Sequence, residues 1–187
     1  MVSINYEFNP NLIQSLVGKS FIKYRCDDFF VGNDVLELVG LFIGENVFSL
    51  RANFEMVDYL GEPDDIAYMK FSYDKEQNIV SVFKEGVMNE HPINSKIASI
   101  KVFNDHQLLV KNNKVEYDAH VTRAILFYLD DNREILFEKA NWVYSENISI
   151  RTGQNLEKEL SDVNFFCEGW DDFGVDASCS RSMKEYK

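Results

Sequence analysis

The chain is poor in the residues that form linkers and cross-links. Its 187 residues include only three prolines, nine glycines and three cysteines. Because no tract of Pro, Gly or Ser interrupts it, no segment has the composition of a flexible tether between domains. We therefore predict a single domain spanning residues 1–187, with a β core in residues 1–155 and a C-terminal appendage, residues 156–187, packed on it.

Cysteine pairs and long apolar runs are also missing. Cys26, Cys167 and Cys179 are odd in number and show no CxxC spacing, which argues against a disulfide framework and against a four-ligand zinc site. No window approaches 18 consecutive apolar residues, and the first residues lack a basic stretch followed by an apolar one. We expect a cytoplasmic protein with reduced thiols, neither exported nor membrane-bound.

Basic residues are scarce. Nineteen Lys and Arg stand against 31 Asp and Glu, which gives a net charge of −12. This field would repel a phosphate backbone, so we expect no direct nucleic-acid binding. A partner protein with a basic surface is the class of partner that the charge favours.

The hydrophobic content predicts a folded, mainly β protein. Hydrophobic residues make up 45% of the chain and aromatic residues 14%, enough to fill a core. Short strands recur about every eight to twelve residues, with polar turns between them, which favours an all-β antiparallel sandwich or open barrel with meander connections. One short N-terminal helix is predicted between Asn9 and Gly18, and a mostly irregular acidic segment after Ile150.

The stretch from Val121 to Arg151 is predicted to be the hairpin that organises the sheet. Apolar residues alternate on both faces of its first arm, as in a central strand. The turn at Asp130-Asp131-Asn132 has no Gly, so we expect a loop longer than two residues with Asn132 in the left-handed region. A third strand is expected from Trp142 to Ile150.

Further strands follow from the same alternation. They are predicted at residues 21–26, 35–43, 46–51, 54–59, 66–73, 79–84, 96–103, 107–110 and 114–117. Breaks are predicted at Ala52-Asn53, in the loop at residues 60–65, at Asn104-Asp105, and in a connection, residues 88–95, that contains Pro92.

One polar trio has the residue types of a catalytic or metal site. Strand alternation places Glu116, Asp118 and His120 on one face, in steps of about 6 to 7 Å. Two carboxylates and an imidazole can hold a divalent metal or perform acid–base chemistry. The same pattern describes the solvent face of an exposed strand, so we assign no catalytic residue, metal or cofactor from it and keep a metal-assisted hydrolase or nuclease as the alternative function.

Established enzyme motifs are not found elsewhere in the chain. There is no nucleophilic-serine elbow, no HExxH and no calcium loop. Gly18-Lys19-Ser20 is not the end of a phosphate-binding loop, because position 13 is Ile where that motif has Gly.

Acids and aromatic rings alternate near the C-terminus. Between residues 157 and 176 there are seven acids and one base, Lys158. Such a segment could present aromatic anchors and acids to a basic partner, or its rings could close the open end of the core. The predicted partner-binding residues are Phe165, Phe166, Glu168, Trp170, Asp171, Asp172 and Phe173.

These patterns lead to a functional hypothesis. We expect a non-enzymatic protein-binding domain, with an inhibitor or immunity-type protein that blocks a basic, nucleic-acid-handling partner as its sharpest version. A structural module of a larger assembly is a third possibility.

Overall fold

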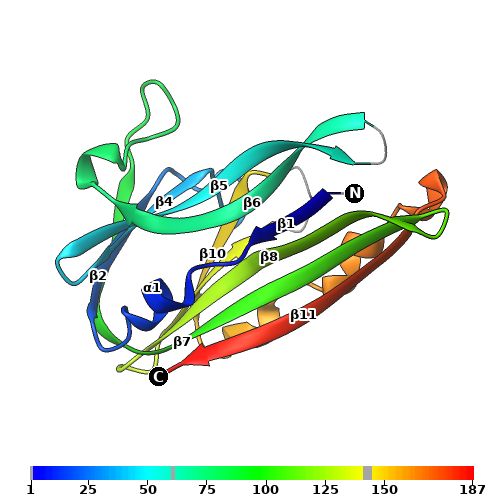
Figure 1. The fold of residues 1–187 in the computed structure, drawn as a ribbon. Helices are drawn as coiled ribbons and strands as arrows, with labels where there is room; N and C mark the ends of the chain where they lie inside the picture. The colour runs from blue at the N-terminus through cyan, green and yellow to red at the C-terminus, as the bar shows by residue number, and fades with distance from the viewer. Residues whose placement is uncertain (1, 60–61, 141–144) are drawn as a thin grey trace.

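The computed structural model describes residues 2–59, 62–140 and 145–187 and shows an all-β protein. Strands hold 61% of the residues and helices 11%. The strand order is β3-β10-β9-β8-β7-β2-β4-β5-β6, and β1 and β11 pair with β8 and β7 (Figure 1). Nearly all neighbours are antiparallel, and β1 with β8 is a parallel pair. The predicted antiparallel all-β class is confirmed.

The elements have the following bounds. The strands are β1 (Val2–Tyr6), β2 (Ser20–Cys26), β3 (Asp34–Leu36), β4 (Leu38–Ile43), β5 (Asn46–Tyr59), β6 (Glu62–Asp74), β7 (Asn89–Lys111), β8 (Lys114–Leu129), β9 (Glu134–Lys139), β10 (Asn147–Gly153) and β11 (Asp176–Tyr186). The helices are α1 (Pro10–Gln14) and four 3-10 helices, η1 (Glu76–Asn78), η2 (Leu156–Glu159), η3 (Val163–Cys167) and η4 (Asp171–Phe173).

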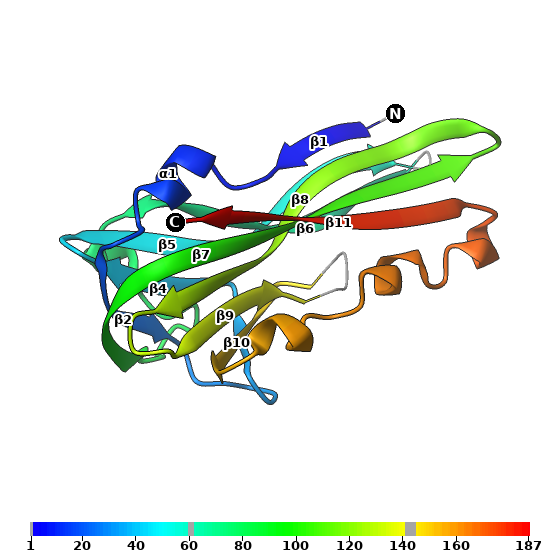
Figure 2. The same ribbon diagram turned by 90° about the horizontal axis from the view of Figure 1, so that it is seen from below.

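Strand β7 joins the two layers of the molecule. Its first part, Asn89 to Lys96, pairs with β2, and from Ile97 onward it pairs with β8. Strands β2, β4, β5 and β6 therefore form one layer, and β7 to β11 form most of the other (Figures 1 and 2). The far end of β7 and β8 continues as a four-stranded sheet, β1-β8-β7-β11.

The main core fills the space between the layers. Phe21 of β2 meets Phe127 of β8 edge to face at 5.2 Å between ring centroids, and Phe127 meets Phe137 at 6.0 Å. Helix α1 adds Ile13, and the turn after it adds Leu16, both fully buried. Aromatic pairs of this geometry stabilise a core beyond the area that they bury.

The organising hairpin is confirmed. Strands β8 and β9 pair from Ala124 opposite Glu138 to Tyr128 opposite Glu134. Asn132 has a φ of 66°, the left-handed conformation expected of it. Strand β10 supplies the third strand at Asn147–Gly153. Trp142 and Tyr144, predicted to belong to that strand, lie outside the described residues.

The predicted N-terminal helix is present but short, and the prediction of a mostly irregular C-terminal segment is wrong. Most helical residues lie in η2, η3 and η4 near the C-terminus, where an irregular segment was expected. After them β11 pairs with β7 along its whole length, from Asp176 opposite Val110 to Tyr186 opposite Ile100. Helix α1 spans only Pro10 to Gln14, with its first turn capped by the side chain of Asn9.

Several predicted breaks are wrong because the residues at them are paired. Strand β5 continues through Ala52-Asn53, and β6 already begins at Glu62, inside the predicted loop. Strand β7 continues through Asn104-Asp105 and contains Pro92, which lies opposite Lys23 at a register shift where β7 has one residue more than β2. The ladder with β8 shifts register between Phe103 and Asn104, where Arg123 of β8 is the extra residue, and β7 runs on through the predicted turn.

The predicted strand at residues 79–84 is a loop that covers β4. Ile79 is buried against Gly40, where an added Cβ would lie 2.3 Å from Ile79 Cγ2. Only glycine leaves room for this close approach. The loop therefore packs on the sheet and does not pair with β6.

Candidate functional site

The predicted partner-binding residues lie in one continuous segment, the C-terminal strap (residues 156–174), which contains η2, η3 and η4. Figures 1 and 2 show the strap behind β7, β8 and β11, on the side of the sheet away from α1. It connects β10 to β11.

A buried ion cluster fixes the middle of the strap. Asp105 of β7 is only 1% exposed and accepts hydrogen bonds from Arg123 Nε (3.1 Å) and Arg181 Nε (2.6 Å). Arg181 also donates to the backbone oxygen of Ser161 at 2.8 Å. Burial alone would lower the pKa of Arg181, but hydrogen bonding to Asp105 and its charge raise that pKa above the ordinary value. Asp105 thus holds Arg181 in place, and Arg181 connects the sheet to the strap.

A second buried acid holds the start of the strap. Glu138 of β9 pairs with Arg151 at 2.8 Å and accepts hydrogen bonds from the backbone N–H and the hydroxyl of Ser161. Arg151 donates in turn to the backbone oxygen of Glu159 at 3.0 Å. Lys101 pairs with Glu157 at 2.6 Å. These contacts make the strap a fixed part of the structure.

The seven predicted residues divide between the two sides of the strap. Phe166 is 4% exposed and stacks near Tyr117, with 6.4 Å between ring centroids. Trp170 is half-buried beside Phe166 and donates its Nε1–H to the Phe166 backbone oxygen at 2.7 Å. The other five point outward: Phe165 (37% exposed), Phe173 (67% exposed), Glu168, Asp171 and Asp172. We call these five residues the outer strap face.

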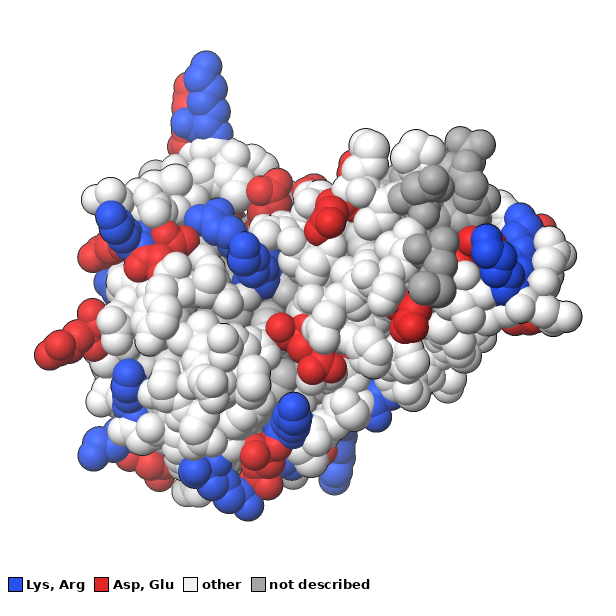
Figure 3. Space-filling view, viewed as in Figure 1, with Lys and Arg blue, Asp and Glu red and all other residues white. Residues whose placement is uncertain are grey.

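The outer strap face is acidic and locally unneutralised. Within the described part of the chain, no Lys, Arg or His forms an ion pair with Glu168, Asp171 or Asp172. On the opposite side of the molecule, drawn in Figure 3, Lys and Arg are interspersed with Asp and Glu. The outer strap face thus carries three acids that form no ion pair with a described cation, in a chain whose net charge is −12.

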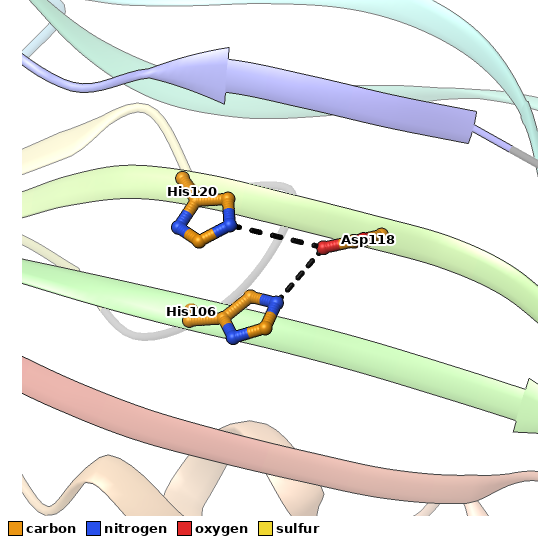
Figure 4. A group of neighbouring side chains, drawn as sticks. All are labelled: His106, Asp118 and His120. Carbon is orange, nitrogen blue, oxygen red and sulfur yellow. Dashed lines mark hydrogen bonds and ion pairs between the residues drawn. The ribbon is translucent and has the colours of Figure 1, made fainter.

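The polar trio predicted on β8 is rearranged in the structure. Asp118 and His120 lie on one face of β8, and His106 of β7 joins them from the position directly opposite His120 (Figure 4). His106 Nε2 lies 2.8 Å from Asp118 Oδ1, and His120 Nε2 lies 4.0 Å from the same oxygen. We call these three residues the histidine–aspartate cluster.

Glu116 does not belong to this cluster. Its carboxylate lies 3.1 Å from Lys114 Nζ, and the ladder between β7 and β8 shifts register at Leu109/Val110, beside it. The predicted trio of Glu116, Asp118 and His120 is therefore not what the structure brings together. His106 could have been found from sequence only with the β7–β8 register, which the wrongly predicted break at Asn104-Asp105 concealed.

Two neighbouring loops expose apolar side chains that were not predicted as functional. Val82 N donates to Asp27 Oδ2 at 3.1 Å and Asn89 Nδ2 donates to Asp28 Oδ1 at 2.6 Å, which holds the loops side by side. Their exposed members are Phe29, Phe30, Val31, Val80, Val82, Phe83 and Val87. The sequence could have indicated this loop patch only if its apolar residues had been assigned to loops. Residues 79–84 were predicted to form a strand, so their apolar side chains were not expected to be exposed.

The thiols give no sign of activation. All three cysteines are free, and burial raises the pKa of both Cys26 and Cys179 to about 12. Thiols with raised pKa values are poor nucleophiles at neutral pH.

No helix among the described residues is long and apolar enough to cross a membrane.

Comparisons with known proteins add no relative. No family model matches the chain, and neither a curated protein nor a solved structure matches it. The strap, the loop patch and the histidine–aspartate cluster are therefore the features from which a function can be inferred.

Proposed function

We propose that this protein acts without catalysis by binding another protein that has a basic surface, and that the outer strap face forms the contact. The observation that carries the proposal is the presence, in one short segment, of two exposed rings, Phe165 and Phe173, and three acids with which no described cation forms an ion pair. Large exposed rings beside unpaired charge are what a recognition surface needs.

The strap is well suited to present such a surface. Its inner side is fixed by Phe166, by the hydrogen bond that Ser161 donates to Glu138 and by the one that its backbone oxygen accepts from Arg181, so little conformational freedom remains to be lost when a partner binds. The rings supply desolvated contact area, and the acids accelerate encounter with a basic surface.

A partner that handles nucleic acid is the sharpest form of the proposal. Such proteins have basic grooves that neutralise phosphates, and an acidic surface with aromatic anchors would occupy one of them. A protein that occupies such a groove would block nucleic acid from entering it, which is an inhibitor or immunity-type role inside the cell. The alternative function, a metal-assisted hydrolase, is not proposed, because Glu116 does not lie with the other two residues of the predicted trio.

The test begins with capture on the immobilised full chain from a lysate of the organism that encodes it, at about 50 mM and about 500 mM salt. An electrostatically steered partner should bind at low salt and leave at high salt, because the Debye length shortens from above 10 Å to about 4 Å. The captured protein is then purified for binding kinetics against defined variants.

Four variants distinguish the strap from the rest of the surface. Asp171→Asn with Asp172→Asn should slow association and flatten its salt dependence, and Phe173→Ala should weaken binding by more than about 1 kcal/mol. Glu37→Gln with Glu85→Gln removes the same charge from exposed positions outside the strap and should bind like the parent. The proposal is wrong if no protein is captured, or if binding survives the strap changes but is lost in Phe83→Ala with Val87→Ala, since the loop patch would then be the interface.

A further inference from the structure

The histidine–aspartate cluster has the ligands and the arrangement of a metal site, on the face of the β1-β8-β7-β11 sheet opposite to the strap. His106 and His120 are direct partners in the antiparallel β7–β8 ladder, and Asp118 is two residues from His120 on the same strand. Direct cross-strand partners place their side chains on the same face with Cβ atoms roughly 5 Å apart, and the diagonal neighbour lies within reach. The backbone thus brings three potential ligands together before any side chain rotates.

The side chains converge within this frame. The two imidazole rings are parallel within 6° and 4.2 Å apart, and both Nε2 atoms face Asp118 Oδ1 (Figure 4). One ligand atom from each residue lies within 4.8 Å of the other two. In tetrahedral zinc sites, bonds of about 2.0–2.2 Å put ligand atoms about 3.3 Å apart, and the ion lies in the plane of each ring that binds it, so the two rings must turn out of their parallel stack to enclose an ion.

The ligand set selects a class of ion. Imidazole nitrogens favour Zn²⁺, Cu²⁺ and Ni²⁺ over Mg²⁺ and Ca²⁺, which prefer all-oxygen ligands. Two histidines and one carboxylate are also a known three-ligand set for zinc with an open fourth position. All three side chains are partly exposed, so an ion can enter from solvent and retain water in that position.

We infer that His106, Asp118 and His120 form a binding site for one divalent transition-metal ion, with Zn²⁺ as its representative. The two Nε2 atoms and one Asp118 carboxylate oxygen are the protein ligands. The site lies on the sheet face away from the strap, so it does not depend on the partner proposed above.

The ion-free geometry has an alternative explanation in a surface hydrogen bond. Asp118 accepts from a ring nitrogen of His106 in the present arrangement, which by itself requires no ion. The two explanations predict different results. Metal binding requires one ion per chain, a response to the ion at both histidines of the cluster, and the presence of His120. A simple hydrogen bond requires none of these.

The direct test is titration of the chelator-treated full chain with Zn²⁺ by calorimetry at pH 7.5. We expect one ion per chain, and a loss of affinity of at least about tenfold in each of His106→Ala, His120→Ala and Asp118→Asn, because two ligands hold zinc far less well than three. His91→Ala removes the third histidine of the chain, which stacks on Tyr24 at 4.5 Å, and should bind like the parent.

Nitrogen-15 NMR of the three histidine rings keeps the test decisive even if a variant fails to fold. Zn²⁺ should shift the Nε2 resonances of His106 and His120 in the parent protein and leave those of His91 in place. Acid should release the ion, since protons compete for the ligand nitrogens. Binding that is equally tight in His106→Ala with His120→Ala, absence of one-to-one binding in the parent, or a response at His91 alone would overturn the inference.

Discussion

Lys139 is buried at the end of β9 with only 5% of its surface exposed. Its Nζ donates to the backbone oxygen of Ala140 at 3.2 Å, and the Arg123 guanidinium contributes positive charge nearby. Burial, with repulsion from Arg123 as the smaller cause, lowers the pKa of Lys139 well below its ordinary value. A cation in this position costs stability at neutral pH.

We therefore predict that Lys139→Met stabilises the fold in a pH-dependent way. Between the lowered folded-state pKa and the ordinary value near 10.4, the unfolded chain binds more protons, so the parent's free energy of unfolding rises with pH across that window. The gain from Lys139→Met should be largest at pH 6–7, about 1.4 kcal/mol for each unit by which the pKa is lowered, and should shrink toward pH 10.

Chemical denaturation of parent and variant at pH 6, 7, 8, 9 and 10 measures this effect. Lys158→Met, which removes an exposed positive charge from the strap, is the control and should change stability by less than about 0.5 kcal/mol. A destabilised Lys139→Met protein with the same deficit at every pH would show that Lys139 is a favourable, charged part of the fold.

Single residue types predicted local geometry better than they predicted burial. Asn132 was correctly expected in the left-handed region, because Asn tolerates that conformation and the turn has no Gly. Asp105 was taken as a turn residue for equally good local reasons, but Arg123 and Arg181 neutralise it inside the sheet. Both arginines are distant in sequence, so no local pattern reveals them.

At the scale of elements, the strap has two sides with different roles. Phe166 belongs to a small core cluster with Tyr117, Leu109 and Val175, and Trp170 packs at its edge. Phe173, a few residues later, is mostly exposed. The aromatic residues that were expected to act together therefore divide into two groups: some close the core, and the others lie on the surface.

This separation predicts opposite effects of two Phe→Ala substitutions. Phe166→Ala should cost roughly 3 to 5 kcal/mol of folding free energy, because it leaves a cavity under the strap. Phe173→Ala should change stability by less than about 0.5 kcal/mol, as for other exposed side chains. Trp170→Ala should fall between them, since its ring is half-buried and its Nε1–H bonds the Phe166 backbone.

Denaturant unfolding of the three variants, followed by circular dichroism, decides the point. Equal destabilisation by Phe166→Ala and Phe173→Ala would mean that the outer ring also belongs to the core, and the outer strap face would lose its main anchor.

Elements were predictable from sequence where alternation was strict and turns were local. The β8–β9 hairpin was found because apolar residues alternate along both arms up to a polar loop. The continuity of β7 was missed because Pro92 and Asn104-Asp105 normally end strands, and a register shift and a bulge accommodate them here. Strand β11 was missed because its residues are mostly polar and its partner, β7, is distant in sequence.

At the scale of the whole molecule, β7 turns the sheet from one layer into the other and continues into a four-stranded extension. The strap covers one side of that extension, and the histidine–aspartate cluster lies on the other (Figures 2 and 4). The two candidate sites therefore use opposite sides of the same strands, and each can be changed without touching the other.

The class of fold followed from composition and strand spacing, whereas the sites depended on long-range pairing. Short apolar stretches with polar turns favour a sandwich whichever strands become neighbours. The histidine–aspartate cluster exists only because β7 and β8 pair with His106 opposite His120. A one-residue slip would turn one of these rings to the other face.

The measurement that tests the proposed function most directly is photo-crosslinking inside the native cell. A benzophenone side chain replaces Phe173, which is 67% exposed on the outer strap face, and in a matched variant it replaces the exposed ring of Tyr73 on β6. We expect a discrete covalent adduct with a basic protein at position 173 that disappears when Asp171 and Asp172 are changed to Asn. No such adduct is expected at position 73. Equal adducts at both positions, or none at position 173, would contradict the proposal that the strap is the binding surface.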